Sequence, residues 1–243
     1  MASHRIALEC SDDFAIVRFD DGRANAIDAD WCVEFGVALD AVERDPTLRA
    51  LVLCGRPGFF SAGLDRDVLP GLSPDALRAT TAAFVAAMER VFLFPKPVIA
   101  ASAGHALAGG FMLFCAADLR LAVDEERSRY GLPEVTQGIP VIGPTAAICA
   151  AAIPPAQHAS LVMHGKRLSA AVAHARGIVH ELLPDSAALE VRACERAVAL
   201  RVDLAAYAAT KRALRAPLVA AATAAMQALG EALPGGNPFR QRT

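Results

Sequence analysis

Two short apolar runs, each followed by a glycine-rich stretch and then by a helical pattern, constrain the fold of this chain most. They lie at residues 50–54 (ALVLC) and 98–102 (VIAAS). A continuous apolar run is expected of a strand that is buried on both faces, as in a sheet covered by helices. Strands that alternate with helices in this way predict a domain of the α/β class.

The surrounding segments fit the same alternation. The helix expected after the capping residue Asp28 extends to about Arg44, and the sequence Ser73-Pro74-Asp75 begins a helix that ends before Pro95. Short strands are predicted at Ile6–Cys10, Phe14–Phe19, Leu119–Val123 and Arg129–Gly131.

Beyond Pro144 almost every segment is predicted to be helical, and a loose tail follows. No low-complexity linker interrupts the chain, so we predict one domain, with an α/β core over residues 1–195 and a helical C-terminal region over residues 196–243. The helices of this part are expected from Ser169 to Gly177, from Ser186 onward, from Asp203 to about Leu214, and over residues 217–233.

Composition excludes several classes of protein. The net charge is −2 and the basic residues are scattered, so no nucleic-acid surface is expected. The six cysteines form no CxxC pair and the six histidines no HExxH motif, which predicts no metal site and no disulfides, but buried reduced thiols in a cytoplasmic protein. The N-terminus lacks the apolar region of a signal peptide, and the apolar runs fall short of the ~20 residues of a membrane span.

Two glycine-containing segments have compositions suited to ligand binding. The first, residues 60–65 (FSAGLD), follows the buried strand at 50–54, and its small residues allow a ligand to approach the backbone. The second, residues 104–110 (GHALAGG), leads from a strand into a helix, where free N–H groups form an anion site. An ordinary tight turn and close helix–strand packing explain the same residues equally well.

A third segment, residues 130–134 (YGLPE), places the acid Glu134 in a stretch that is otherwise mostly apolar up to Gly143. A carboxylate in such surroundings has a raised pKa and suits the work of a general base. A surface or helix-capping glutamate would have the same local sequence.

The order and spacing of these segments resemble the crotonase (enoyl-CoA hydratase/isomerase) superfamily over most of the chain. Residues 23–27 (RANAI) are similar to the family's R-x-N-A-[LI] segment, and residues 60–65 to its F-[SAC]-A-G-x-D loop. Residues 106–118 resemble the pattern A-x-G-G-G-x-x-L-x-x-x-x-D, and residues 131–140 the pattern G-x-P-E-x-x-x-G-x-x-P. Residues 171–184, with Gly177-Ile178-Val179, resemble the family's A-x-x-x-G-[LI]-V helix exit.

This resemblance implies a spiral of ββα repeats with a helical C-terminal portion, and homo-trimers or dimers of trimers. It implies that no cofactor is tightly bound and that coenzyme A enters as part of an acyl-CoA substrate of the kind used in fatty acid metabolism. An oxyanion hole would use the N–H groups of Leu64 and Gly109, and Glu134 would be the catalytic base. Substrate-binding positions implied by the match are Arg23 near the phosphates, Ala62 and Asp65 near the adenine, and Ala24, Gly63, Gly110 and Met112.

One departure from the family pattern bears on the reaction. Hydratases of the family use two glutamates, and Met112 stands at the first of these positions, which leaves only Glu134. Hydration needs a carboxylate to activate water and a proton source, whereas a Δ3-to-Δ2 double-bond shift needs a single base. We therefore expect an isomerase rather than a hydratase, with Met112 and Phe111 lining the acyl pocket.

Other functions stay open at this stage. A single glutamate also suits decarboxylation, enolate carbon–carbon bond formation, or a non-catalytic acyl-CoA binder. Asp67 offers a second acid, although a solvated loop aspartate is the simpler interpretation, and His105 fits a structural histidine. A serine hydrolase is not favoured, because Ser61 and Ser102 lack the context of a nucleophile. The C-terminal region is short against the family's pattern and lacks its acidic helix motif.

Overall fold

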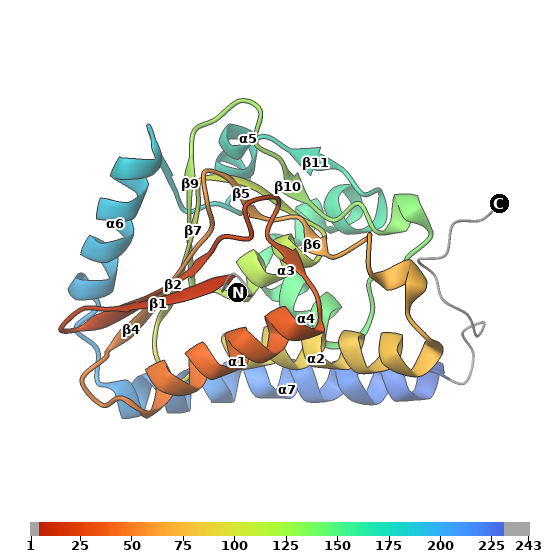
Figure 1. The fold of residues 1–243 in the computed structure, drawn as a ribbon, viewed down its shortest axis with the longest axis horizontal. Helices are drawn as coiled ribbons and strands as arrows, with labels where there is room; N and C mark the ends of the chain where they lie inside the picture. Colours follow the sequence, from red (N-terminus) through yellow and green to blue (C-terminus); the bar gives the residue numbers. More distant parts are fainter. Residues whose placement is uncertain (1–4, 231–243) are drawn as a thin grey trace.

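The computed structural model describes residues 5–230, and its largest sheet confirms the α/β class. The strand order is β1-β2-β4-β7-β9-β12, in which β1 and β2 form an antiparallel hairpin and the later strands run parallel (Figure 1). Every residue of β4 and β7 is buried, as their apolar sequences predict. The bounds are β1 Ile6–Cys10, β2 Phe14–Phe19, β4 Ala50–Cys54, β7 Val98–Ser102, β9 Leu119–Val123 and β12 Glu181–Leu183.

A second sheet, in the order β11-β10-β8-β5, stands beside the first. The chain alternates between the two sheets: β4 leads to β5, β7 to β8 and β9 to β10, and each pair is followed by a helix. This alternation is the expected spiral of ββα repeats. The bounds are β5 Gly58–Ser61, β8 Gly104–Leu107, β10 Tyr130–Gly131 and β11 Arg167–Leu168, and a separate short pair joins β3 Ala26–Ile27 to β6 Gly63–Leu64.

The two helices with predicted caps form as expected. The Asp28 side chain accepts a hydrogen bond from the N–H of Trp31 and caps α1 (Ala29–Arg44). Ser73 caps α2 (Pro74–Phe92) in the same way, with Pro74 at the first helical position. The apolar face of α1 packs Trp31 and Phe35 against the core, as the spacing predicts.

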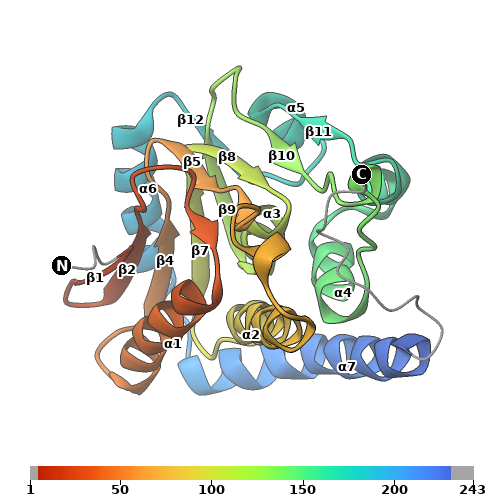
Figure 2. The same ribbon diagram turned by 45° about the vertical axis from the view of Figure 1, so that its right-hand side comes forward.

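Helix α3 (Gly109–Ala116) lies at the centre of the molecule, between the sheets and helices α2 and α4 (Gly143–Ala152) (Figure 2). All of its residues are buried, which explains a sequence that is apolar around the whole helix. Its first turn is therefore held from every side by the core.

The C-terminal half contains two strands that the sequence did not predict, β11 and β12. Each has only two or three residues, too few to show an alternating pattern. Helix α6 is capped by Asp185 instead of Ser186 and covers the far face of the main sheet (Figure 1). The boundary after residue 195 falls inside this helix. The remaining bounds are α5 Ala170–Ala175, α6 Ser186–Ala199, short 3-10 helices at Leu69–Gly71, Val135–Gln137 and Pro155–Gln157, and a π-helix at Ala159–Met163.

The last helix, α7 (Leu204–Gly230), corrects the prediction of two helices that meet near Pro217. Proline cannot donate a hydrogen bond to the carbonyl four residues earlier, which usually ends a helix. Here Lys211 and Val219 are buried on either side of Pro217, so packing against the core keeps the helix continuous. The expected tail and residues 231–233 of the predicted last helix lie outside the described residues.

The cysteine prediction holds only in part. Cys32, Cys54, Cys115 and Cys149 are buried free thiols, but Cys10 is exposed on the edge strand β1 and Cys194 is half-buried. Over residues 5–230, no single helix is long and apolar enough to cross a bilayer. A pair of helical segments, Gly143–Ala152 and Pro155–Met163, passes that test only when taken together across a bend of 116°.

Candidate active site

The loop between β5 and β6 presents one free backbone N–H. The N–H of Asp65 donates to the carbonyl of Ile27 at 2.8 Å, where β6 runs parallel to β3. Alternate N–H groups of a strand point to opposite sides, so the N–H of Leu64 points away from β3. The Ser61 hydroxyl fixes the loop by donating to the carbonyl of Asn25 at 2.7 Å and accepting from the N–H of Gly63 at 3.0 Å.

The start of α3 presents a second free N–H. The Ala108 carbonyl accepts from the N–H groups of Phe111 and Met112, at 2.9 and 3.0 Å. In a trans peptide the N–H points opposite to the carbonyl, so the N–H of Gly109 points out of the helix. Ala108 has φ 51° and ψ −130°, a strained conformation for a residue with a side chain. The outward-pointing N–H of Gly109 lies at the N-terminus of α3, which is the positive end of the helix dipole.

These two N–H groups come from loops that touch. A Cβ added to Gly63 would stand 2.6 Å from the backbone nitrogen of Gly109, and Gly63 has φ +89°. A Cβ added to Gly110 would collide with the carbonyl of Ser61. Glycine is therefore required here for close backbone approach, and the segments at 60–65 and 104–110 lie together as one site.

Glu134 follows three residues after the end of β10. The N–H of Ala108 donates to the carbonyl of Gly131 at 3.0 Å, which ties the segment before Glu134 to the start of α3. The Glu134 side chain is 8% exposed, and its Oε2 has no hydrogen-bond partner among the described residues. Burial raises its pKa to about 7. A carboxyl group with this pKa can both take and return a proton near neutral pH.

The first turn of α3 is apolar. Met112 lies in the first turn of α3 and is 6% exposed, so the position holds a buried thioether. Phe111 is fully buried and stacks on Phe114 at 6.4 Å between ring centroids. Among the described residues Glu134 is the one buried acidic side chain.

The residues expected near coenzyme A lie in the segments that flank β3 and β6. The N–H of Ala62 donates to the carbonyl of Ala24 at 2.9 Å, which brings the two segments together. The Asp65 side chain accepts from the N–H of Asp67 at 2.8 Å and so stabilises the turn that follows β6. Arg23 is exposed and pairs with Asp67 at 3.3 Å. Asp67 is itself 77% exposed, which fits a solvated loop residue and not a second buried acid.

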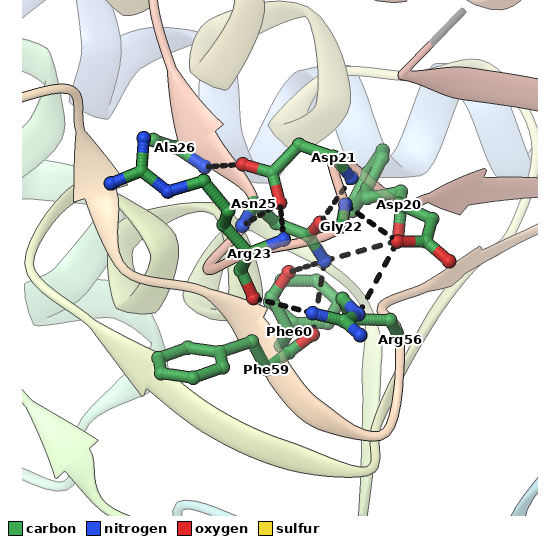
Figure 3. A network of polar contacts seen from close by, with 10 residues as sticks. Asp20, Asp21, Gly22, Arg23, Asn25, Ala26, Arg56, Phe59 and Phe60 are labelled. Carbon is green, nitrogen blue, oxygen red and sulfur yellow. Dashed lines mark hydrogen bonds and ion pairs between the residues drawn. The ribbon is translucent and has the colours of Figure 1, made fainter. Parts of the chain in front are cut away.

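A buried asparagine supports the loops, and its importance was not predicted. Asn25 is 1% exposed and its Nδ2 donates to the carbonyls of Phe19, Phe59 and Phe60 (Figure 3). Its φ of 52° is left-handed, a conformation that asparagine tolerates better than most residues. The sequence feature that could have indicated this role is an asparagine between the two alanines of residues 23–27 (RANAI).

Asp21 holds the turn that carries Arg23 and Asn25. Its carboxylate accepts hydrogen bonds from the N–H groups of Arg23, Asn25 and Ala26 (Figure 3). Partial burial opposes ionisation, but the three donors outweigh it and the pKa of Asp21 is lowered. The Arg56 guanidinium donates to the carbonyl of Arg23 at 2.8 Å and pairs with Asp20, which closes the network.

Three further candidates have structural partners. His105 accepts a hydrogen bond from the N–H of Arg129 through Nδ1, and burial lowers its pKa. Ser102 donates to the carbonyl of Gly104 and accepts from the Tyr130 hydroxyl, and Ser61 is bonded as described above. Within the part of the chain that the structure describes, no group of three or more His, Cys, Asp or Glu side chains could hold a metal ion.

Comparisons with known proteins show the family of this chain. Residues 9–232 match the family model described as enoyl-CoA hydratase/isomerase. A putative enoyl-CoA hydratase of Thermus thermophilus is 34% identical over 174 residues, which span 70% of this chain and 68% of that protein. A carnitinyl-CoA dehydratase of Salmonella typhi is 36% identical over 176 residues, 72% of this chain and 66% of that protein. A solved Mycobacterium tuberculosis protein, described as an enoyl-CoA isomerase in one structure and as a probable enoyl-CoA hydratase in another, has in the first a TM-score of 0.83 at 27% identity, covering 94% of this chain and 99% of its own.

Proposed function

Because the chain belongs to the enoyl-CoA hydratase/isomerase family, we propose that it stabilises a thioester enolate and shifts a Δ3 double bond to Δ2 in an enoyl-CoA. One observation supports the isomerase reaction above the others of the family. Glu134 is buried with a raised pKa, and Met112 occupies the position at which hydratases of the family have their other glutamate. The site therefore offers a single proton acceptor.

The reaction follows from one base and two donors. Ionised Glu134 takes the C2 proton, and the electrons of that C–H bond enter a dienolate whose negative charge lies on the thioester oxygen. The N–H groups of Leu64 and Gly109 stabilise this oxygen without having to reorganise, and one such donor is typically worth ~10²–10³ in rate. Protonated Glu134 then returns the proton to C4, and the double bond moves to C2–C3.

Hydration is the second candidate, and the names of the relatives favour it. The Thermus thermophilus protein is described as a putative hydratase and the Salmonella typhi protein as a dehydratase. Addition of water needs a group that activates the water while another protonates the α-carbon. A thioether at Met112 supplies neither, so this reaction requires a further polar group in the site. Decarboxylation, carbon–carbon bond formation and non-catalytic acyl-CoA binding make the same use of the two N–H donors.

Coenzyme A is proposed to lie along the outer side of the β5–β6 loop. Ala24, Ala62 and Asp65 would face its adenine end, with Gly63 and Gly110 allowing close approach to the thioester. The exposed guanidinium of Arg23 suits an interaction with phosphate. A homo-trimer or a dimer of trimers is the proposed assembly.

An ultraviolet assay with 3-enoyl-CoA and, separately, trans-2-enoyl-CoA of several chain lengths tests the proposal. We expect the 3-enoyl thioester to be converted to the 2-enoyl thioester, and Glu134→Gln to abolish this conversion. The matched control is Glu89→Gln on α2, since burial also raises the pKa of Glu89. Loss of 2-enoyl absorbance through hydration would replace the isomerase assignment. Thioester binding without either conversion would favour the other enolate reactions or a binding protein.

A further inference from the structure

A phenyl ring occupies the space in which a side chain at residue 109 would stand. A Cβ added to Gly109 would lie 2.9 Å from Cζ and 3.0 Å from Cε2 of Phe84. The next neighbour, Cα of Gly63, is at 3.4 Å, which is an ordinary contact. A side chain at position 109 would therefore require the ring of Phe84 to shift.

Neither the backbone angles of position 109 nor its other contacts within the described residues demand glycine. Its φ lies outside the left-handed region, and it is the first residue of α3, where alanine favours a helix more than glycine does. The other glycines of the site differ, because the obstacles that they face are backbone atoms. Gly63 faces the nitrogen of Gly109, and Gly110 faces the carbonyl of Ser61.

The side chain of Phe84 is buried within the core. It is 3% exposed in the middle of α2, which packs against both α3 and α4 (Figure 2). One turn later Met88 is fully buried in the same core cluster, and close packing in such a core restricts movement of the ring. Gly109 is thus held between the ring of Phe84 and the backbone of Gly63.

We propose that Phe84 is a positioning residue for the oxyanion hole: its ring sets where the N–H of Gly109 stands relative to the N–H of Leu64. The proposal rests on the proposed function, because it assigns the N–H of Gly109 to the thioester oxygen. Phe84 touches the peptide that carries this donor and acts through it. A shift of this peptide moves the donor away from the developing charge, and small misplacements in a preorganised site cost much of the rate.

A compensating pair of substitutions tests this role. Gly109→Ala should lower kcat about 10²-fold, because the methyl group meets Phe84 and displaces the N–H. Phe84→Leu, which keeps an apolar side chain but removes the ring edge, should lower kcat about tenfold with KM within about twofold. The double variant Gly109→Ala/Phe84→Leu should recover at least about tenfold in kcat over Gly109→Ala alone.

The control pair is Gly110→Ala with and without Phe84→Leu. Its obstacle is the carbonyl of Ser61, so Phe84→Leu should not rescue it. A double variant at 109 and 84 that is no more active than Gly109→Ala overturns the proposal. Equal rescue of Gly110→Ala overturns it as well, because the effect would then be a general loosening of the core.

A spectroscopic readout separates this proposal from the proposed function. Acetoacetyl-CoA forms an enolate that absorbs in the near ultraviolet. Binding to the wild type should increase this absorbance over that of free acetoacetyl-CoA. The increase should be smaller in Gly109→Ala and should recover in the double variant. This pattern in a protein that turns over neither enoyl thioester supports the role of Phe84 while the isomerase assignment fails. If the double variant recovers thermal stability but not the enolate spectrum, the role of Phe84 is overturned. It is also overturned if the wild type binds acetoacetyl-CoA without forming any enolate.

Discussion

Lys211 on α7 donates a 2.8 Å hydrogen bond to Asp118, and the two side chains are only 4% and 17% exposed. Asp118 also pairs with Arg215 at 2.7 Å and accepts from the N–H of Val98 at the same distance. One carboxylate thus joins α7 to the start of β7. Burial lowers the pKa of Lys211 to about 8 despite this partner, so the ammonium depends on Asp118 for its charge.

Asp118→Ala should therefore lower the free energy of unfolding by about 3–5 kcal/mol, since it leaves a buried charge unpaired. Urea denaturation measures the loss. The double variant Asp118→Ala/Lys211→Met removes the unpaired charge and should recover part of the lost free energy of unfolding. Asp75→Ala, at an exposed ion pair with Arg78, should leave the midpoint unchanged. A double variant less stable than Asp118→Ala would contradict the pairing argument.

Glu134 should cost stability at neutral pH. Its pKa is about 7 in the folded protein and about 4.5 in the unfolded chain, so the folded state binds more protons between these values. Stability is then expected to fall as pH rises from about 4.5 to about 7. Glu134→Gln removes this dependence and should be more stable than the wild type by about 3 kcal/mol above pH 7, with no difference near pH 4. Equal stability of both proteins at all pH values would mean that the carboxyl is solvated.

The same group should set the pH profile of activity. The base must be ionised to take the C2 proton, so kcat/KM should rise with pH through an apparent pKa of about 7. Rates across pH 5 to 9 with a 3-enoyl-CoA, in about half-unit steps, measure it. A profile that is flat from pH 5 upward would assign the proton transfer to a group other than Glu134.

Gly63→Ala should abolish activity, and Gly58→Ala should not. Both glycines have φ +89°, but a Cβ at Gly58 meets open space while one at Gly63 meets the nitrogen of Gly109. Each substitution carries the strain of a left-handed alanine, roughly 1–2 kcal/mol. Only Gly63→Ala also blocks the donor, which should lower kcat at least ~10²-fold. Similar losses of kcat in the two variants would show that backbone strain alone is responsible.

Asn25→Asp should destabilise the loops of the site more than Asn25→Gly. The aspartate cannot donate to the carbonyls of Phe19, Phe59 and Phe60, and it buries a charge beside them. Glycine keeps the left-handed backbone and loses only the hydrogen bonds. We expect losses above about 3 kcal/mol for Asn25→Asp and about 2 kcal/mol for Asn25→Gly, measured by chemical denaturation. The reverse order would mean that the amide donors contribute little.

The sequence predicted those features that depend on local chemistry. The caps at Asp28 and Ser73, the buried strand at residues 50–54 and the helix that starts at Gly109 all follow from short-range patterns, and the structure has them. The ββα spiral was expected only through resemblance, because periodicity does not reveal which strands share a sheet. β12 escaped prediction since its three half-buried residues carry no alternation.

Features that arise from long-range contact were beyond local patterns. The local sequence fits a surface Glu134 as well as a buried one, and only the packing of β10 against β8 and α3 decides between them. The ring of Phe84 meets Gly109 from a different helix, so neither residue signals the other. The continuity of α7 across Pro217 likewise depends on contacts with the core and not on helix propensity.

Pro217 interrupts the backbone hydrogen bonds in the middle of α7. The carbonyl of Ala213 lacks its usual helical donor, so the backbone ladder is weakest at that point. The N-terminal half is held by the ion pairs of Lys211 and Arg215 with Asp118. The C-terminal half packs through apolar side chains, Val219 in the core and Met226 beside Gly143. Native-state hydrogen exchange should therefore divide at residue 217, with amides of the second half opening at lower free energy than those of the first. The first half of α7 would then stay fixed to the core, while the second half could move about residue 217.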